Sequence, residues 1–198
     1  PIVTEGSTTT IVPGVLSGQL NAAIVHLPID DPELVVEPLF GEDLFLLVPH
    51  GHPLAGHSEL PLRNLHEVPI LLPPKGTALR RVLDRAAAGS GVTLKPLAEI
   101  DGVRLLSSLA IDGFGPGIVP ATAMPRYAAS LYARVSVPEL PRRVVALIRR
   151  RRPASSAATN AVAAILSEVI AAHADEQPGV HAGPAALPAQ PPRPATRE

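Results

Sequence analysis

The stretch Glu99–Pro120, with the sequence EIDGVRLLSSLAIDGFGPGIVP, decides how this chain can fold. It reads as the end of a strand, a helix, a glycine-rich turn and a short buried strand. Asp101 is placed to cap the helix, whose apolar residues recur at helical spacing on one face. We expect the helix to end near Gly113 and the strand to end at Pro120. A strand that leads into the capped start of a helix is a common way for α/β proteins to build a small-ligand site.

The composition indicates one globular domain or two small lobes. Of the 198 residues 46% are hydrophobic, but three are Phe, two are Tyr and none is Trp, so the core must be aliphatic. The formal net charge of −1 argues against nucleic-acid binding by the chain as a whole. The absence of cysteine excludes disulfides and thiol chemistry in this sequence. Because neither a membrane-spanning run nor a leader is visible, we expect a cytoplasmic location and no membrane partner.

Strands and helices alternate along most of the chain, which favours an α/β fold with mostly parallel sheets. Short apolar runs predict the strands, at residues 1–4, 20–25, 34–40, 44–48, 68–72, 94–100, 118–119, 131–137 and 144–148.

Helical spacing, preceded by capping residues, predicts four helices. They are expected to begin after the hydroxyl-rich turn 7–10, at Thr77, at Asp101 and at Ser155 or Ser156. The last helix is expected to bury Ala158, Val162, Ile165, Leu166, Val169 and Ile170. The Pro/Ala-rich residues 174–198 lack periodicity and are expected to be a disordered tail.

Three of these helix starts are candidates for binding a ligand. They are the turns with Ser7 and Thr8, with Thr77, and with Asp101-Gly102-Val103. Each follows an expected strand, so each can lie at the carboxyl end of a parallel sheet, where ligands bind. On the residues alone, an ordinary helix cap explains each turn as well.

The remaining motifs predict no catalytic, metal or cofactor site. The histidines at 50, 52, 57 and 66 lack regular metal-ligand spacing. The glycines of 113–117 follow a helix instead of a strand, which argues against a dinucleotide site. No Gly-x-Ser-x-Gly elbow is present.

The charged residues outside these turns also have structural interpretations. Glu42 and Asp43 fit a turn between two strands. The six arginines at 142, 143 and 149–152 fit the solvated ends of a central strand, 144–148.

Several short motifs occur in an order that is specific as a series. Residues 18–23, GQLNAA, are similar to a G-x-L-D-x-A segment, with Asn21 in place of the usual Asp. Residues 48–55 are similar to a V-P-x-x-H-P-L-A stretch, and Glu99–Pro120 to an E…L-V-x-x-G-x-G-I-x-x-P region. All three segments resemble the effector-binding domain of LysR-type transcriptional regulators. The resemblance extends, in order, over residues 1 to about 173.

The resemblance implies an α/β fold like that of type II periplasmic binding proteins, with an effector in a cleft between two lobes. It assigns residues 1–48 and 129–173 to lobe one and 49–128 to lobe two. Lobe one would be incomplete, because the family's first strand and helix have no counterpart in this sequence. The implied ligand-binding residues are Ser7, Thr8, Thr77, Asp101, Gly102 and Val103.

The implied function is effector sensing in a transcriptional regulator, without enzymatic activity and without a cofactor. The ligand would be a small, anionic metabolite, since hydroxyls and helix N-termini favour anions. DNA would bind only through an N-terminal helix-turn-helix domain outside this sequence. The sequence is therefore expected to be a fragment, natural or prepared, or a truncated gene product, and the full-length protein to be a homo-oligomer. The alternative is a transporter's solute-binding protein, which shares the fold and would carry an export signal.

Overall fold

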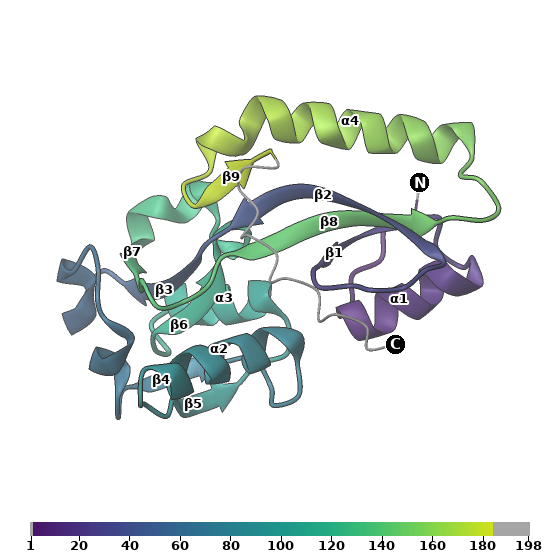
Figure 1. Ribbon diagram of the computed structural model, residues 1–198. Helices are drawn as coiled ribbons and strands as arrows, with labels where there is room; N and C mark the ends of the chain where they lie inside the picture. Colours follow the sequence, from purple (N-terminus) through teal and green to yellow (C-terminus); the bar gives the residue numbers. More distant parts are fainter. Residues whose placement is uncertain (1, 184–198) are drawn as a thin grey trace. The chain divides into compact units, whose positions relative to one another are not determined.

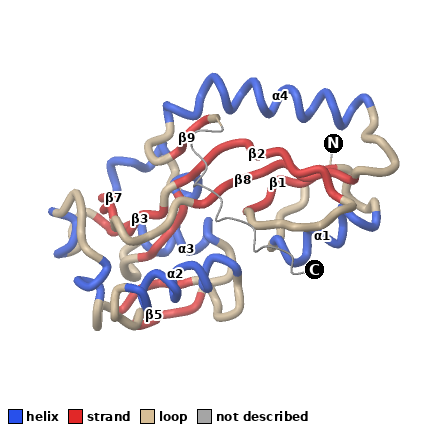
Figure 2. The backbone as a smooth tube through the Cα atoms, in the orientation of Figure 1, coloured by secondary structure: helices blue, strands red, loops and turns tan. Residues whose placement is uncertain are grey.

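The computed structural model describes residues 2–183, which form two compact units (Figure 1). The first unit takes the described residues of Pro1–Gly41, Val144–Asp175 and His181–Glu198. The second takes Glu42–Arg143 and Glu176–Val180. Both units combine helices with a sheet, and Figure 2 shows the alternation along the chain.

The first unit is built on a sheet with the strand order β1-β8-β2-β9, in which β1 and β8 are antiparallel. The cluster Val15, Val25, Leu34 and Ile148 forms its core. Its strands are β1 (Ala22–His26), β2 (Leu34–Glu42), β8 (Arg143–Arg150) and β9 (Val180–Ala182), and its helices are α1 (Thr8–Ser17) and α4 (Ala157–His173).

The second unit is built on a mixed sheet with the order β5-β4-β6-β3-β7. Strand β4 is parallel to β5 and β6, whereas β3 is antiparallel to β6 and β7. The strands are β3 (Leu44–Pro49), β4 (Pro69–Leu72), β5 (Lys95–Glu99), β6 (Gly117–Pro120) and β7 (Tyr132–Ser136), and the helices are α2 (Ala78–Gly89) and α3 (Val103–Ile111).

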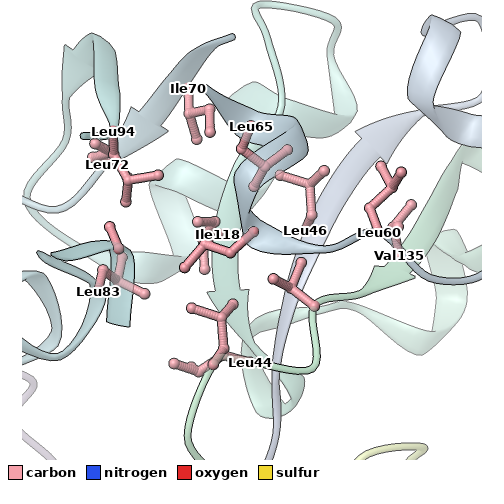
Figure 3. Close-up of a cluster of buried hydrophobic side chains, with 14 of the residues drawn as sticks. Leu44, Leu46, Leu60, Leu65, Ile70, Leu72, Leu83, Leu94, Ile118 and Val135 are labelled. Carbon is pink, nitrogen blue, oxygen red and sulfur yellow. The ribbon is translucent and has the colours of Figure 1, made fainter. Parts of the chain in front are cut away.

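Continuous apolar strands give the second unit a core on each face of its sheet. Side chains alternate between the faces of a strand, so Leu46 of β3 enters one cluster and Leu47 the other. The first cluster takes Leu83 from α2 (Figure 3), and the second takes Leu106 and Ala110 from α3. Burial on both faces explains why these strands lack polar alternation.

The predicted elements of the second unit are confirmed, with ends that differ by at most two residues. In the first unit the predicted strand at 1–4 is wrong over its described part: residues 2–7 form no strand, and Ile2 and Val3 are 96% and 91% exposed. A strand persists only where a neighbour accepts its backbone hydrogen bonds. No strand of residues 2–183 pairs with this segment.

Two further expectations are corrected. The sheets are mixed instead of mostly parallel, because β3 reverses direction against β6 and β7. In α4, Val162, Ile165 and Val169 are each more than half exposed and Ala158 is also exposed. The helix buries Ala163 and covers the predicted Leu166 and Ile170 in part, so the buried stripe is narrower than expected.

The chain beyond α4 and the boundaries between the units also differ from the prediction. Residues 174–183 are ordered, with a 3-10 turn at Ala174–Glu176 followed by β9; the remainder of the predicted tail lies outside the described residues. Residues 42–48 and 129–143, assigned to lobe one on the resemblance, belong to the second unit because β3 and β7 pair in its sheet. Among residues 2–183, no helix has the length and apolarity that crossing a bilayer requires.

Candidate functional site

Two of the three candidate turns lie at one edge of the second unit's sheet. Thr77 follows β4, and Asp101 to Val103 follow β5. The two strands are parallel neighbours, with Leu72 opposite Glu99 at their ends. Because parallel strands end at the same edge, the structure brings Thr77 and the 101–103 turn to that edge.

Thr77 caps α2 as predicted. Its backbone is extended, and its Oγ1 accepts a hydrogen bond from the Arg80 amide at 3.2 Å. The same hydroxyl donates to the carbonyl of Pro74 at 2.8 Å. The side chain is half-buried and held by both bonds, so its position is set by the turn.

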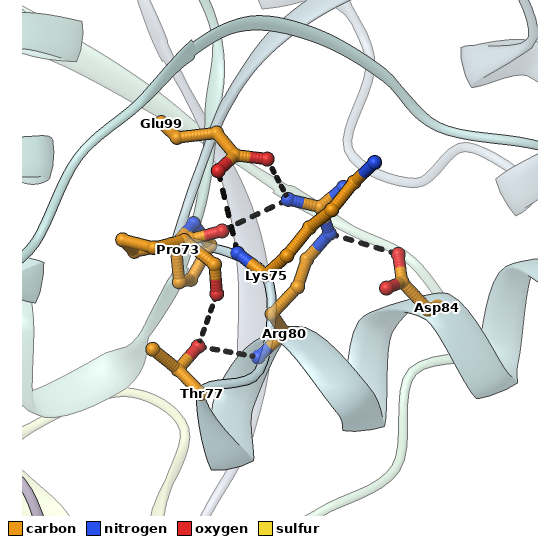
Figure 4. A network of polar contacts seen from close by, with 7 residues as sticks. Pro73, Lys75, Thr77, Arg80, Asp84 and Glu99 are labelled. Atoms are coloured by element: carbon orange, nitrogen blue, oxygen red, sulfur yellow. Dashed lines mark hydrogen bonds and ion pairs between the residues drawn. The ribbon is translucent and has the colours of Figure 1, made fainter.

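The side chain of Arg80 joins the turn after β4 to the end of β5 (Figure 4). It is 3% exposed, and its Nη1 donates to Glu99 Oε1 at 2.8 Å and to the Pro73 carbonyl at 3.0 Å. Its Nε donates to Asp84 Oδ1 at 2.9 Å. The other oxygen of Glu99 accepts from the Lys75 amide at 3.3 Å. The network therefore couples the two candidate turns.

Both members of the central pair are charged at neutral pH. Burial by itself lowers the pKa of Arg80, but the hydrogen bonds and charges of Asp84 and Glu99 outweigh it and raise that pKa. The hydrogen bond from Arg80, with that from the Lys75 amide, lowers the pKa of Glu99. Since Arg80 is already neutralised by two carboxylates, its charge holds the turns together and is not free for a ligand.

The start of α3 differs from the prediction, because Asp101 does not cap the helix. The N-cap position is Gly102, which has φ +97° and no side chain to accept from the helix amides. A Cβ at Gly102 would meet no atom within 4 Å, so glycine is needed for the backbone angle and not for space. Asp101 is exposed, and Val103 is half-buried against the first core cluster. The N-cap residue of α3 therefore offers its first amides no side-chain acceptor.

Ser7 and Thr8 lie in the first unit, at the start of α1. Ser7 holds the N-cap position but makes no capping bond with its side chain; its hydroxyl pairs with those of Thr9 at 2.8 Å and Thr10 at 3.2 Å. Ser7 is exposed and Thr8 is half-buried. The expectation that this turn follows a strand is wrong, since residues 2–7 form none.

A protein-family comparison identifies the chain. The family model described as the LysR substrate binding domain matches residues 2–171. The chain belongs to the LysR substrate-binding domain family. It carries the effector-sensing type of domain that the sequence motifs predicted, and the alternative of a transporter's solute-binding protein is not favoured.

Curated relatives of this LysR-type domain are transcriptional regulators. The "Probable hydrogen peroxide-inducible genes activator" of Streptomyces viridosporus is 33% identical over 175 residues, covering 85% of this chain and 55% of that protein. The protein of the same name from Mycobacterium leprae is 28% identical over 174 residues, with the same two coverages. The chain thus spans about half the length of the curated relatives it matches.

Solved structures confirm the predicted fold class. The effector-binding domain of QuiR, in complex with shikimate, superimposes with a TM-score of 0.72 at 20% identity, covering 85% of this chain and 80% of that one. A reduced form of OxyR from N. meningitidis gives a TM-score of 0.68 at 25% identity, covering 89% and 81%. The LysR-type domain therefore has the α/β fold of the periplasmic-binding-protein type.

This LysR-type domain also contains a buried ion pair that sequence reasoning missed. Glu42, 0% exposed, accepts from Arg143 Nη2 at 3.0 Å and from the Thr122 hydroxyl at 2.7 Å. Burial lowers the pKa of Arg143, although the charge of Glu42 opposes the shift. The solvated strand end predicted at Arg143 is thus wrong: the side chain is 9% exposed and paired. No local sequence pattern indicates this contact, because Glu42 and Arg143 lie far apart in the sequence.

The candidate residues line neither of two cavities in the described part of this LysR-type domain. One, of about 190 Å³, lies in the first unit beside Asn21, Arg150 and Ser155. The other, of about 290 Å³, lies in the second unit beside Phe45, Val137 and Arg142. Within residues 2–183, no group of three or more potential ligand side chains is arranged to hold a metal ion.

Proposed function

We propose that this domain senses a small anionic metabolite. The ligand contacts Thr77 and residues 101–103 in the second unit, and the family resemblance adds Ser7 and Thr8 of the first unit to the expected contacts. In the longer protein, binding changes how a separate N-terminal domain contacts DNA. The observation that carries the proposal is the paired turns at the ends of β4 and β5, held together through Arg80 and Glu99.

The edge formed by these turns suits an anion. The first amides of α3 have no side-chain cap, and a helix N-terminus carries a partial positive charge. Lys75 is exposed in the neighbouring turn. Arg80 and the Lys75 amide compensate the negative charge of Glu99, so its repulsion of an incoming carboxylate is reduced. A carboxylate with hydroxyls, such as the shikimate bound by the QuiR domain, fits these donors.

A thiol-based response to peroxide does not fit these 198 residues. The relatives are named for hydrogen peroxide, and the protein group that peroxide oxidises most readily to a reversible state is a cysteine thiolate. This sequence contains no cysteine, and its one methionine, Met124, is 3% exposed. Reversible ligand binding therefore suits the chain better than oxidation.

The proposal extends to the whole protein. DNA contact belongs to a domain outside this sequence, subunits pair in the longer protein, and the protein acts in the cytoplasm without catalysis or a cofactor. Its support is that the relatives are longer regulators, of which this chain covers 55%. Ligand binding would then shift the population of DNA-binding arrangements.

Calorimetric titration of the chain with shikimate and a panel of small carboxylates tests the ligand. Thr77→Ala should weaken binding by about tenfold or more, which corresponds to about 1.4 kcal/mol. The matched control is Ser156→Ala, because Ser156 caps α4 with the same kind of bond, from the Thr159 amide, outside the proposed site. Equal losses in both variants, or no heat from any carboxylate, would contradict the proposal.

The first-lobe side is tested separately with Ser7→Ala. This change removes an exposed hydroxyl that makes no capping bond, so α1 should remain intact. Reduced affinity for the same carboxylate, with an unchanged circular dichroism spectrum, is the expected result. If affinity is unchanged while Thr77→Ala abolishes it, the first lobe does not contribute through Ser7.

A further inference from the structure

The segment Glu176–Val180, which we call the strap, follows α4 but belongs to the second unit. It has the sequence EQPGV and lies beyond residue 171, where the match to the family ends. The chain leaves the first unit at Asp175 and returns to it at His181, within β9. Strand β9 is a neighbour of β2 in the first unit's sheet (Figure 1). Both ends of the strap thus continue into elements of the first unit.

Polar contacts fasten the strap to the turn that follows β6. Gln177 Nε2 donates to the carbonyl of Ala121 at 2.8 Å and to that of Met124 at 3.4 Å. Ala121 begins the 3-10 turn Ala121–Ala123, and Met124 follows it. The half-buried amide of Gln177 therefore takes the place of water at a turn of the second unit.

Gly179 makes the closest approach of the strap. Its carbonyl accepts from the Asp43 amide at 2.8 Å, at the start of the segment that enters β3. Its φ is +87°, and a Cβ there would lie 2.4 Å from Phe45 Cε2 and 3.2 Å from the Ala121 Cβ. Only glycine satisfies both the angle and the space. Val180 then packs against the second core cluster, which includes Ala121.

An ion pair completes the attachment at the other end of the strap. Arg126 Nη1 and Glu176 Oε2 are 2.9 Å apart, and both side chains are well exposed. Exposed pairs contribute little to stability. The strap is therefore held mainly by the Gln177 amide, the Gly179 carbonyl and the packing of Val180.

We propose that the strap is a built-in latch that restrains movement between the two units. The chain also crosses between the units at 41/42 and at 143/144. Two such crossings leave the units free to hinge, whereas the strap ties the end of α4 to the second unit at a third place. Undocking the strap releases this restraint. A movement of the units that changes the connection between α4 and β9 must strain or break the hydrogen bonds of Gln177 and Gly179. The proposal does not depend on which ligand the domain binds.

The test compares Gly179→Ala with Gly183→Ala. Both glycines have positive φ, +87° and +82°, so both substitutions introduce the same backbone strain. Only Gly179→Ala places a Cβ against Phe45 and Ala121, because a Cβ at Gly183 meets nothing within 4 Å. Any difference between the two variants therefore reports the docking of the strap.

Two measurements read out the latch in the intact chain. Hydrogen exchange of the Asp43 amide, which bonds to Gly179, should accelerate by about tenfold or more in Gly179→Ala and remain unchanged in Gly183→Ala. Spin labels on Gln19→Cys and Arg85→Cys, one exposed position in each unit, are specific because the chain has no cysteine. Their distance distribution should broaden in Gly179→Ala only.

Each combination of exchange rate and label distance either supports the latch or overturns it. Faster exchange with an unchanged distance distribution would show a docked segment that restrains nothing, and would overturn the latch. Equal effects of the two glycine variants would show that backbone strain, not docking, is responsible. If Gly179→Ala fails to fold, Gln177→Ala removes the amide contact with no new atom. Under the proposal it gives a smaller broadening, and an unchanged distribution there would reject the latch.

Discussion

The two units differ in how completely their sheets are covered. In the second unit, strands such as β3 are buried on both faces, between α2 on one side and α3 on the other. In the first unit β8 is buried from Val144 to Ile148, but the core cluster has only four buried side chains among the described residues, and apolar side chains of α4 remain exposed. Apolar residues stabilise a fold only where a second layer of helices or strands covers them. Stability should therefore be concentrated in the second unit.

The largest expected effect comes from the buried charge of the second unit. Glu42→Ala leaves the Arg143 guanidinium buried without its partner, which should cost about 3–5 kcal/mol of unfolding free energy. The matched change in the first unit is Glu37→Ala, which breaks the more exposed pair with Arg149 and should cost about 0–1 kcal/mol. Urea denaturation followed by circular dichroism measures both. Similar losses of unfolding free energy in the two variants would contradict the expected difference between the units.

The next effect separates two isoleucines by their burial. Ile118→Ala, in β6 with no exposed surface, should lower the unfolding free energy by about 2–5 kcal/mol because it leaves a cavity. Ile165→Ala, on α4 and 58% exposed, should change it by no more than about 0.5 kcal/mol, since alanine is also the better helix former. A large loss for Ile165→Ala in thermal melts would show that α4 is covered in solution.

A smaller effect distinguishes the two hydroxyl-bearing helix starts. Thr77→Ala should destabilise by about 1 kcal/mol, because Thr77 accepts from the Arg80 amide. Ser7→Ala should be close to neutral, because Ser7 makes no such bond. Denaturant midpoints with unchanged slopes would establish the difference. The contrast fails if Ser7→Ala is as destabilising as Thr77→Ala.

The smallest effect is a pH dependence confined to the second unit. Folding lowers the pKa of Glu99 below its usual value of 4.5, so its contribution is present above that value and is lost as the pH falls through the folded-state pKa. Glu99→Gln should therefore flatten the acid limb of the stability curve. Carbon-detected NMR titration of the Glu99 carboxyl provides the direct check, and an ordinary pKa there would contradict the Arg80 contact.

Local features of the site were predictable, whereas its long-range contacts were not. Thr77 was identified as a cap because a cap depends on residues three positions apart. Asp101 was misassigned because the positive φ of Gly102 moves the helix start by one residue. The contact of Arg80 with Glu99 spans 19 residues and that of Glu42 with Arg143 spans 101, and no spacing rule covers such distances.

The sequence by itself determined the positions of the strands and helices in the second unit, the caps of α2 and α4, and the family. Periodicity and capping are local, so they are readable without knowing the fold. Only the tertiary structure decided that β3 runs antiparallel to β6 and β7, that Ile165 is exposed, and that the strap is docked through Gly179. Periodicity shows which face of an element is apolar, but the partner that covers it comes from elsewhere in the chain.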